Sequence, residues 1–511
     1  MNTFKKKALT AAVLGTLGVA GSAHAIYRDA NNLGQALIYP YYTVQSVSNG
    51  GPIDGSFNTY ISVVNTTADV KVVKVRFREG KASSDATDFN VYLSPHDVWT
   101  AAVIPASSDP ASGAVVVSSD RSCVNPGGSG ALALPGHAFV NYDYTGLNDD
   151  GQGSGIDRTR EGYIEILEMG VILPGAAASA ATHSATGTPS CAGLSGDGLL
   201  AGILAPGAGT GLTQPSGGLS GTGTLINVNA GLDVMYNAVA LGDFAVGGNV
   251  YADPGSASPN LSSTTPPVAL VHSGATSYLA TFVALTADAA SATLMHTDAI
   301  NEYILDSATA SDTDWVFTFP TKNFYVAAGA ASAVTPFTEP LVDGAGACES
   351  VAITFRDREE QTTSIPTQFS PPPPTGAGGA LCWESTVLSF RNGLANAPQP
   401  GDTTSLVLGS KNTSTLTLKN FQNGWADITF NDTNATTTGV TAAGGTTFNA
   451  LATPGALGAG PITFLGLPVV GFMVRTFSNG TLSCGTASCQ GNYSGLVNHA
   501  FKDGITPAPT P

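Results

Sequence analysis

Alternating apolar and polar positions predict β-strands along much of the chain. The clearest run is residues 70–79 (VKVVKVRFRE), in which Val73, Val75 and Phe77 face one side and the basic residues between them face the other. This period of two is typical of a half-buried antiparallel strand. Residues 60–65 form a similar run, and because four residues join the two runs, they predict a β-hairpin.

Strand-like runs recur at spacings of roughly ten residues, with turn residues between them. We expect further strands at 37–44, 89–93, 98–104, 138–144, 162–167, 224–229, 233–241, 315–319, 351–355, 388–391, 414–418, 426–430, 446–448 and 469–477. The mixed spacing of apolar residues between 275 and 304 predicts one or two short helices. The chain therefore predicts a mainly β protein of tandem antiparallel β-sandwich domains of the immunoglobulin-like type, with long Gly/Ala/Ser-rich loops and a few short helices.

Stretches rich in small residues suggest how the chain is divided. Residues 174–220 consist largely of Ala, Gly, Ser and Thr, and a loop this long inside a compact domain predicts an insertion. A second such stretch, residues 328–346, predicts a domain boundary. We expect a signal peptide at 1–25, an N-terminal β-sandwich region at 26–340 with the insertion near 174–220, a C-terminal β-rich domain at 341–505, and a disordered tail at 506–511.

The first 25 residues have the three parts of a bacterial secretion signal. Lysines at positions 5–7 precede an apolar run at 8–20 of about a dozen residues, which is too short to span a bilayer. Residues 23–25 (Ala-His-Ala) match the small-x-small pattern of a signal peptidase site. We expect a mature chain that starts near Ile26 and works at the cell surface or outside the cell. The alternatives are the periplasm as its location and an uncleaved N-terminal anchor; no later stretch predicts a transmembrane helix.

The charge balance narrows the choice of partners. The chain has 37 acidic and 20 basic residues, a net charge of −17, and removal of the signal lysines brings the net charge to about −20. An acidic surface repels nucleic acid and anionic lipid, so we expect no nucleic-acid partner. Charged residues are only 11% of the chain, so much of the polar surface must come from Ser, Thr, Asn and backbone groups.

All six cysteines lie in the mature part of the chain. An even number in an oxidising compartment predicts three disulfides. Other pairings stay open, but we favour the sequential one because each bond then closes a loop within one region. The favoured pairs are Cys123–Cys191, Cys348–Cys382 and Cys484–Cys489.

Motifs of catalysis are absent from the sequence. It contains no G-x-S-x-G, no H-E-x-x-H, no P-loop and no strand-linked G-x-G-x-x-G. Glu161 and Glu165 would share a strand face about 13 Å apart, which exceeds the usual separation of a glycosidase carboxylate pair. The histidines of the mature chain are scattered singly: His96, His137, His183, His272, His296 and His499.

The best candidate for a metal site is an acidic, glycine-rich loop. Asn148, Asp150 and Asp157 supply oxygen atoms between glycines, which suits Ca²⁺ because it takes six to eight oxygen ligands on a tightly curved backbone. The spacing departs from that of an EF-hand, with Gln152 at the fifth position and Thr159 at the twelfth. The alternative is a solvated acidic turn, and the sequence implies no other cofactor.

Seven stretches spread over the mature chain carry a resemblance to other sequences. They are GQALIYPYYTV (Gly34–Val44), ISVVNTTADVKVVKVRFREG (Ile61–Gly80), YLSPHDVWTA (Tyr92–Ala101), EGYIEILEMG (Glu161–Gly170), LDVMYNAVAL (Leu232–Leu241), TDWVFTFPTKNFYV (Thr313–Val326) and NYSGLVNHAFKDGI (Asn492–Ile505). They resemble a family of uncharacterised exported cell-surface proteins of Gram-negative bacteria. The resemblance implies an envelope or surface location and supplies no catalytic residues.

These observations lead to three functional hypotheses. The first is a non-enzymatic structural or interaction protein of the cell surface, such as a surface-layer, sheath, filament or matrix component, which assembles with itself or with other envelope components. The second is a secreted module that binds glycans or calcium, and the third is an extracellular hydrolase. Candidate tyrosines for a sugar-stacking surface, with ordinary sheet packing as the alternative, are Tyr39, Tyr41, Tyr42, Tyr142 and Tyr144.

Overall fold

Strands make up 48% of the computed structural model and helices 7%, which confirms the mainly β fold. The structure describes residues 24–47, 55–191, 194, 211–362, 369–370, 379–392, 404–418, 421–430, 440–441, 447–453, 461–484 and 487–506. The predicted signal peptide up to residue 23, residues 192–193 and 195–210 of the insertion, and the tail from residue 507 lie outside the described residues. Within the described part, no helix is long and apolar enough to cross a membrane.

The N-terminal half contains two sheets that pack against each other. One sheet has the order β1 (Tyr27–Arg28), β15 (Val239–Gly242), β2 (Ala36–Thr43), β11 (Glu161–Ile172), β4 (Val70–Glu79), β5 (Asp85–Leu93), β8 (Cys123–Asn125) and β9 (Gly128–Ser129), with β12 (Leu212–Thr213) beside β11. The other has the order β10 (His137–Ala138), β7 (Ala114–Val117), β6 (Val98–Pro105), β3 (Asn58–Asn65), β13 (Leu219–Asn227) and β14 (Leu232–Asn237). Strands β3 and β4 therefore belong to different sheets, and the hairpin predicted for them is wrong.

The C-terminal half also has two main sheets. One has the order β23 (Gly379–Leu381), β21 (Glu349–Asp357), β26 (Asn423–Thr429), β19 (Asp298–Ile304) and β34 (Ala500–Lys502). The other has the order β22 (Phe369–Ser370), β25 (Thr413–Leu418), β24 (Ser385–Asn392), β20 (Ser311–Thr318), β32 (Val470–Cys484) and β33 (Ala487–Asn498). Because β19 and β20 pair with these later strands, the second half starts before residue 298, earlier than the predicted boundary at 341.

Smaller elements connect and cap the sheets. The short strands are β16 (Val268–Ser273) with β17 (Thr276–Thr281), β18 (Met295–His296) with β31 (Leu467–Pro468), β27 (Val440–Thr441) with β28 (Thr447–Phe448), and β29 (Ala450–Ala452) with β30 (Thr463–Leu465) and β35 (Gly504–Thr506). The helices are α2 (Ala176–Ala181), α4 (Ala287–Ala292) and the 3-10 turns η1 (Tyr142–Tyr144), η2 (Gly146–Asn148), η3 (Ile156–Arg160) and η5 (Lys322–Phe324). Of the predicted helical region 275–304, residues 287–292 are helical, and strands occupy much of the rest.

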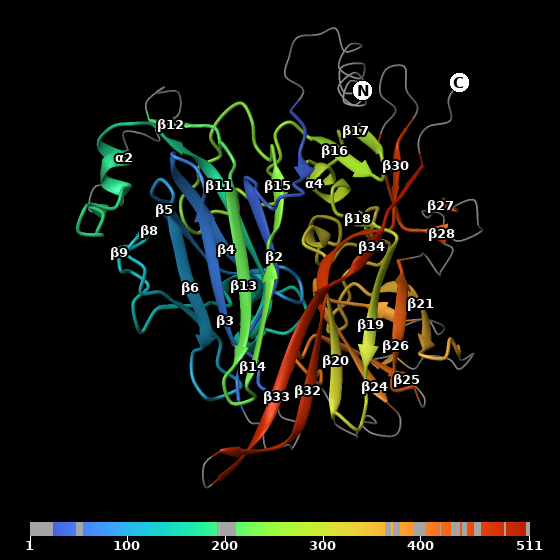
Figure 1. The fold of residues 1–511 in the computed structure, drawn as a ribbon. Helices are drawn as coiled ribbons and strands as arrows, with labels where there is room; N and C mark the ends of the chain where they lie inside the picture. Colours follow the sequence, from blue (N-terminus) through green and yellow to red (C-terminus); the bar gives the residue numbers. More distant parts are fainter. Residues whose placement is uncertain are drawn as a thin grey trace, which may run out of the picture.

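One hydrophobic cluster crosses the boundary between the two halves, and the C-terminal half has a second large cluster of its own. Figure 1 shows the N-terminal half, coloured blue to green, beside the C-terminal half, coloured yellow to red. Val316 and Phe472 of the second half belong to the same buried cluster as Leu37 and Ile61 of the first. Strands β14 and β33 also meet along the seam, where Ser494 Oγ accepts a hydrogen bond of 3.2 Å from the backbone N–H of β14. The relative position of the halves is therefore set by packing as well as by polar contacts.

The first sheet of the N-terminal half is buried on both faces, so we call it the covered sheet. All ten residues of β4 are buried, and the prediction of a half-buried strand is wrong for this reason. The segment after β15 lies over the basic side chains: Lys74 Nζ donates to the carbonyl of Asp253 at 2.9 Å, and Arg76 Nη1 donates to that of Pro259 at 3.0 Å. The predicted alternation is present, but a second layer of chain covers its polar side.

Ion pairs with carboxylates on the neighbouring strands β5 and β11 balance the buried basic side chains. Lys74 Nζ lies 2.9 Å from a carboxylate oxygen of Asp88, and Arg76 Nε lies 2.9 Å from one of Asp85. Lys71 pairs with Glu168 at 2.7 Å on the neighbouring strand β11. Buried charges need such partners because removal from water costs several kcal/mol per ion.

Two of the three predicted disulfides are confirmed. Cys123 on β8 is bonded to Cys191, and Cys348 is bonded to Cys382 beside the β21–β23 pair. The side chains of Cys484 and Cys489 lie outside the described residues, so their pairing stays a prediction. The immunoglobulin-like type of the sandwiches also stays a prediction, because only the antiparallel, mainly β character is established.

Candidate functional site

The second sheet of the N-terminal half, from β10 to β14, exposes one face, and we call it the open sheet. Ile61, Val63 and Trp99 point into the core, so the residues between them point outward. The outward residues in the strand registers are Asn58, Tyr60, Ser62, Val64, Val98, Thr100, Ala102, Ile104, Val115, Val117, Ala138, Ser220, Thr222, Thr224, Ile226, Asp233, Met235 and Asn237. Val115 and Thr224 are buried, and the others are half-buried or exposed.

This outward face has almost no charge. Asp233, at one edge, is the single charged residue among its outward positions. A shallow, mainly apolar hollow of about 510 Å³ lies on it, lined among others by Tyr60, Ala102, Ile104 and Leu134. Tyr60 is 41% exposed and Leu134 is 78% exposed. The protein thus covers the sheet with charged side chains and leaves the uncharged sheet open.

A second candidate site is a cleft between the two halves, which consists of two adjoining cavities. The first has a volume of about 240 Å³, and its lining residues include members of β1, β2, β14, β15, β32, β33 and β34. The second has a volume of about 230 Å³ and is lined by residues of β1, β16 and β18. Arg28, Asp29 and Ala30 line both cavities, so Arg28 stands where they meet.

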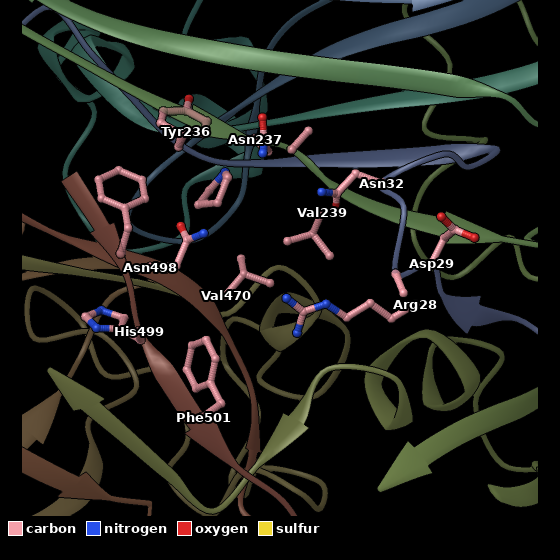
Figure 2. Close-up of a pocket in the computed structure, with 15 residues that line it drawn as sticks. Arg28, Asp29, Asn32, Tyr236, Asn237, Val239, Val470, Asn498, His499 and Phe501 are labelled. Carbon is pink, nitrogen blue, oxygen red and sulfur yellow. The ribbon is translucent and has the colours of Figure 1, made fainter. Parts of the chain in front are cut away.

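The Arg28 guanidinium lies among apolar side chains. Figure 2 shows it extending into the space between Val239, Val470 and Phe501, whereas the carboxylate of Asp29 is turned away. Asp29 instead accepts hydrogen bonds from two backbone N–H groups of its own loop, at 2.8 and 3.1 Å. Within the described part of the chain, the Arg28 guanidinium makes no hydrogen bond or ion pair. Loss of water around it lowers the pKa of Arg28, and the negative charge of Asp503 opposes this shift.

The second cavity contains a histidine–carboxylate pair. His296 Nδ1 lies 2.7 Å from a carboxylate oxygen of Asp503, and the imidazole stacks on the ring of Phe501 with centroids 4.3 Å apart. His296 Nε2 is buried and has no hydrogen-bond partner among the described residues. Burial lowers the pKa of His296, Asp503 raises it, and the positive charge of Arg28 lowers it further. The neutral ring therefore donates from Nδ1 and keeps an acceptor at Nε2.

No protein-family model matches this chain, and no curated protein or solved structure matches it either. The resemblance to exported surface proteins therefore stays a prediction. The function has to be argued from the two sites themselves.

The candidate calcium residues are engaged in other contacts. Both carboxylate oxygens of Asp150 accept hydrogen bonds from Arg158, at 2.8 and 2.7 Å. Asp157 pairs with Lys411 at 3.0 Å, and the side-chain amide of Asn148 donates to a backbone carbonyl. Among the described residues, no three His, Cys, Asp or Glu side chains form a group that could hold a metal ion. In the structure, Asp150 and Asp157 form ion pairs with basic side chains. Calcium binding by this loop stays a prediction.

The candidate residues for a sugar surface or a hydrolase are mostly interior. Tyr39, Tyr41, Tyr42 and Tyr144 are fully buried, which agrees with the alternative of ordinary packing and contradicts a sugar-stacking role for them, whereas Tyr142 is 73% exposed. The tyrosines of β2 are buried because the covered sheet packs on both sides.

The glutamates of β11 are also interior. Glu168 accepts from Lys71, Glu165 lies 3.6 Å from Arg78 Nε, and Glu161 accepts five hydrogen bonds. These carboxylates stabilise the fold rather than form a hydrolase pocket.

Sequence reasoning missed the residues of the cleft. His296 and Asp503 are separated by 207 positions and meet because β18 and β34 lie together beside β19 and β31. His499 is likewise buried, stacks on Phe317 at 4.9 Å, and has its pKa lowered by burial to about 3. The nearest signal in the sequence was Arg28 itself, a basic residue three positions after the predicted cleavage site in a chain with few basic residues.

Glu384 has a buried carboxyl group where the two halves meet, and this group predicts that stability depends on pH. Glu384 accepts a hydrogen bond from Ser83 Oγ at 3.0 Å, and burial raises its pKa to about 8 while Lys322 opposes the shift. The folded protein therefore holds this proton at pH values where the unfolded chain, with a pKa near 4.5, has lost it. The free energy of unfolding should therefore fall as pH rises from about 4.5 to about 8. The Glu384 carboxyl contributes at most about 1.4 kcal/mol of this loss per pH unit.

Replacing Glu384 by glutamine removes the titrating group and keeps the shape of the neutral carboxyl group. We expect the Glu384→Gln variant to match the natural protein in urea unfolding at about pH 5 and to be more stable at about pH 9. A difference in free energy of unfolding that stays constant between these pH values would contradict the assignment.

Proposed function

We propose that this chain is an exported, non-enzymatic structural or interaction protein of the bacterial cell surface, and that copies of it associate through the open sheet. The observation that carries the proposal is the uncharged outward face of this sheet on a strongly acidic protein. The secretion-signal pattern and the disulfides support a location outside the cytoplasm. The lack of catalytic motifs in the sequence agrees with a non-enzymatic role.

Charge explains why a second copy fits this face. Two mature molecules, each with a net charge of about −20 after removal of the three signal lysines, repel each other over most of their surfaces. Contact through the open sheet brings together Tyr60, Ala102 and Ile104 and buries no unpaired charge near the centre. Asp233 lies on β14 at the edge of the sheet, where solvent still screens it.

The size of the face agrees with a stable interface between two copies. Strand β3 has eight residues and is therefore about 26 Å long. The five strands from β7 to β14 are separated by four spacings of about 4.8 Å and span about 19 Å. The face thus covers roughly 500 Å² per copy, or about 1,000 Å² over two copies, which is the lower limit for a specific protein interface.

A charged residue at the centre of this face should block association. We expect Ala102→Glu to weaken self-association at least tenfold, because an unpaired carboxylate buried in an interface costs several kcal/mol. Leu147→Glu is the matched control, since Leu147 is fully exposed on η2, away from the open sheet. Sedimentation equilibrium of the mature protein and both variants measures the effect.

Three outcomes decide between assembly and its absence. Assembly of the natural protein and of Leu147→Glu, but not of Ala102→Glu, supports the proposal. A natural protein that stays monomeric at high concentration, or an Ala102→Glu variant that assembles normally, contradicts it. Fractionation of native cells tests the location, and recovery from periplasmic extract alone would contradict the surface assignment.

A further inference from the structure

We propose that the cleft between the two halves binds a small hydroxylated carboxylate, such as a sugar acid, with its carboxylate on the Arg28 guanidinium. This proposal does not rest on self-association, and Asn237 at the end of β14 belongs both to the open sheet and to the cleft. It rests on three features of the cleft: an unpaired guanidinium, unengaged polar groups around it, and a volume that fits a small molecule.

Arg28 is exposed at the cleft, whereas Arg76, Arg158 and Lys322 are buried. Arg76 and Arg158 each bind carboxylates, and Lys322 donates to the carbonyls of Ala347 and Cys382. Arg28 lies between apolar side chains and makes no such contact within the described part of the chain. A guanidinium presents five N–H donors in a planar fork that matches a carboxylate with two parallel hydrogen bonds. A bound carboxylate would therefore satisfy donors that the protein leaves unused.

The other polar groups of the cleft fit hydroxyl groups. Asn32, Asn237 and Asn498 line the first cavity, and each side-chain amide both donates and accepts hydrogen bonds. In Figure 2, Asn237 and Asn498 lie on the side of the cavity toward which Arg28 extends. A ligand with several hydroxyl groups beside a carboxylate matches this set.

The acidic groups nearby do not compete with such a ligand. Asp29 is engaged by the N–H groups of its own loop and faces away from the cleft. Asp503 is engaged by His296 at 2.7 Å. Together the two cavities reach the range of about 300–1,000 Å³ in which small-molecule sites fall. A phosphorylated polymer or a nucleic acid would bring many negative charges to an acidic surface, whereas one carboxylate brings a single charge.

The test uses D-glucuronate as the probe and D-glucose as its uncharged counterpart. We expect glucuronate to raise the melting temperature of the mature protein and glucose at the same concentration to leave it unchanged. In Arg28→Gln, the apparent Kd for glucuronate from titration calorimetry should rise at least tenfold. Arg121→Gln is the matched control, because Arg121 is a surface residue whose Nη1 donates to Thr188 in an exposed contact.

Two further measurements make the result decisive. The unliganded melting temperature of Arg28→Gln shows whether the variant is folded, and Arg28→Lys, which keeps the charge and loses the planar fork, should bind with intermediate affinity. The proposal is overturned if glucuronate gives no shift with the natural protein, or if it binds Arg28→Gln as tightly. Inorganic phosphate that binds as well as glucuronate would also overturn it, because the site would then recognise charge alone.

Discussion

Replacing Arg158 by methionine is expected to lower the free energy of unfolding by about 3–5 kcal/mol, because two buried carboxylates lose their partner. Arg158 lies on η3 and donates through Nη1 and Nη2 to both oxygens of Asp150, at 2.8 and 2.7 Å. Its Nε donates to Glu79 at 3.1 Å, and its guanidinium lies 4.0 Å from the centre of the Tyr144 ring. Methionine fills much of the same space but makes none of these hydrogen bonds.

Chemical unfolding of three variants separates charge from packing. Lys411→Met is the control, because it breaks a solvent-accessible ion pair between Lys411 and Asp157. The loss of this pair should cost at most about 1 kcal/mol. Adding Glu79→Gln and Asp150→Asn to Arg158→Met neutralises the stranded carboxylates and should recover part of the lost stability. If Arg158→Met unfolds at the same denaturant concentration as the natural protein, the buried ion network contributes little and this account is wrong.

Strand β4, which ends at Glu79, shows why strands could be predicted from the sequence while their surroundings could not. The alternation of Val73, Val75 and Phe77 with basic residues correctly predicts a strand, because a period of two is a local property of extended chain. Whether the basic side faces water depends on a segment near residues 253–259, far away in sequence. A partly polar strand face therefore leaves open whether water or another layer of protein covers it.

The candidate sites show a related limit. The acidic loop at 148–157 invites a calcium interpretation because its oxygen atoms are close in sequence, yet Arg158, the next residue, already binds Asp150. The cleft is the opposite case, since Arg28, His296 and Asp503 come together only through the packing of the two halves. Local spacing reveals sites built on one loop, whereas sites built between sheets need the topology.

The contact between the halves depends on Glu161, and Glu161→Gln is expected to lower the free energy of unfolding by about 2–4 kcal/mol. The carboxylate, at the start of β11, accepts from Tyr41 Oη at 2.7 Å and from Gln45 Nε2 at 3.2 Å in the N-terminal half. From the C-terminal half it accepts from Ser410 Oγ at 2.5 Å and from the backbone N–H groups of Lys411 and Asn412, at 2.8 and 3.3 Å. An amide in its place turns one acceptor into a donor that faces other donors.

The position of Glu161 makes a specific pattern of loosening the expected result. Because three of its five donors come from residues 410–412, the backbone amides there should exchange with solvent faster in Glu161→Gln, while those of β3 and β6 should change less. Glu302→Gln is the control, since Glu302 is 46% exposed at its side chain and pairs with Arg475 at the surface. Uniform faster exchange across both halves would show that Glu161 stabilises the whole fold and is not a specific tie between the halves.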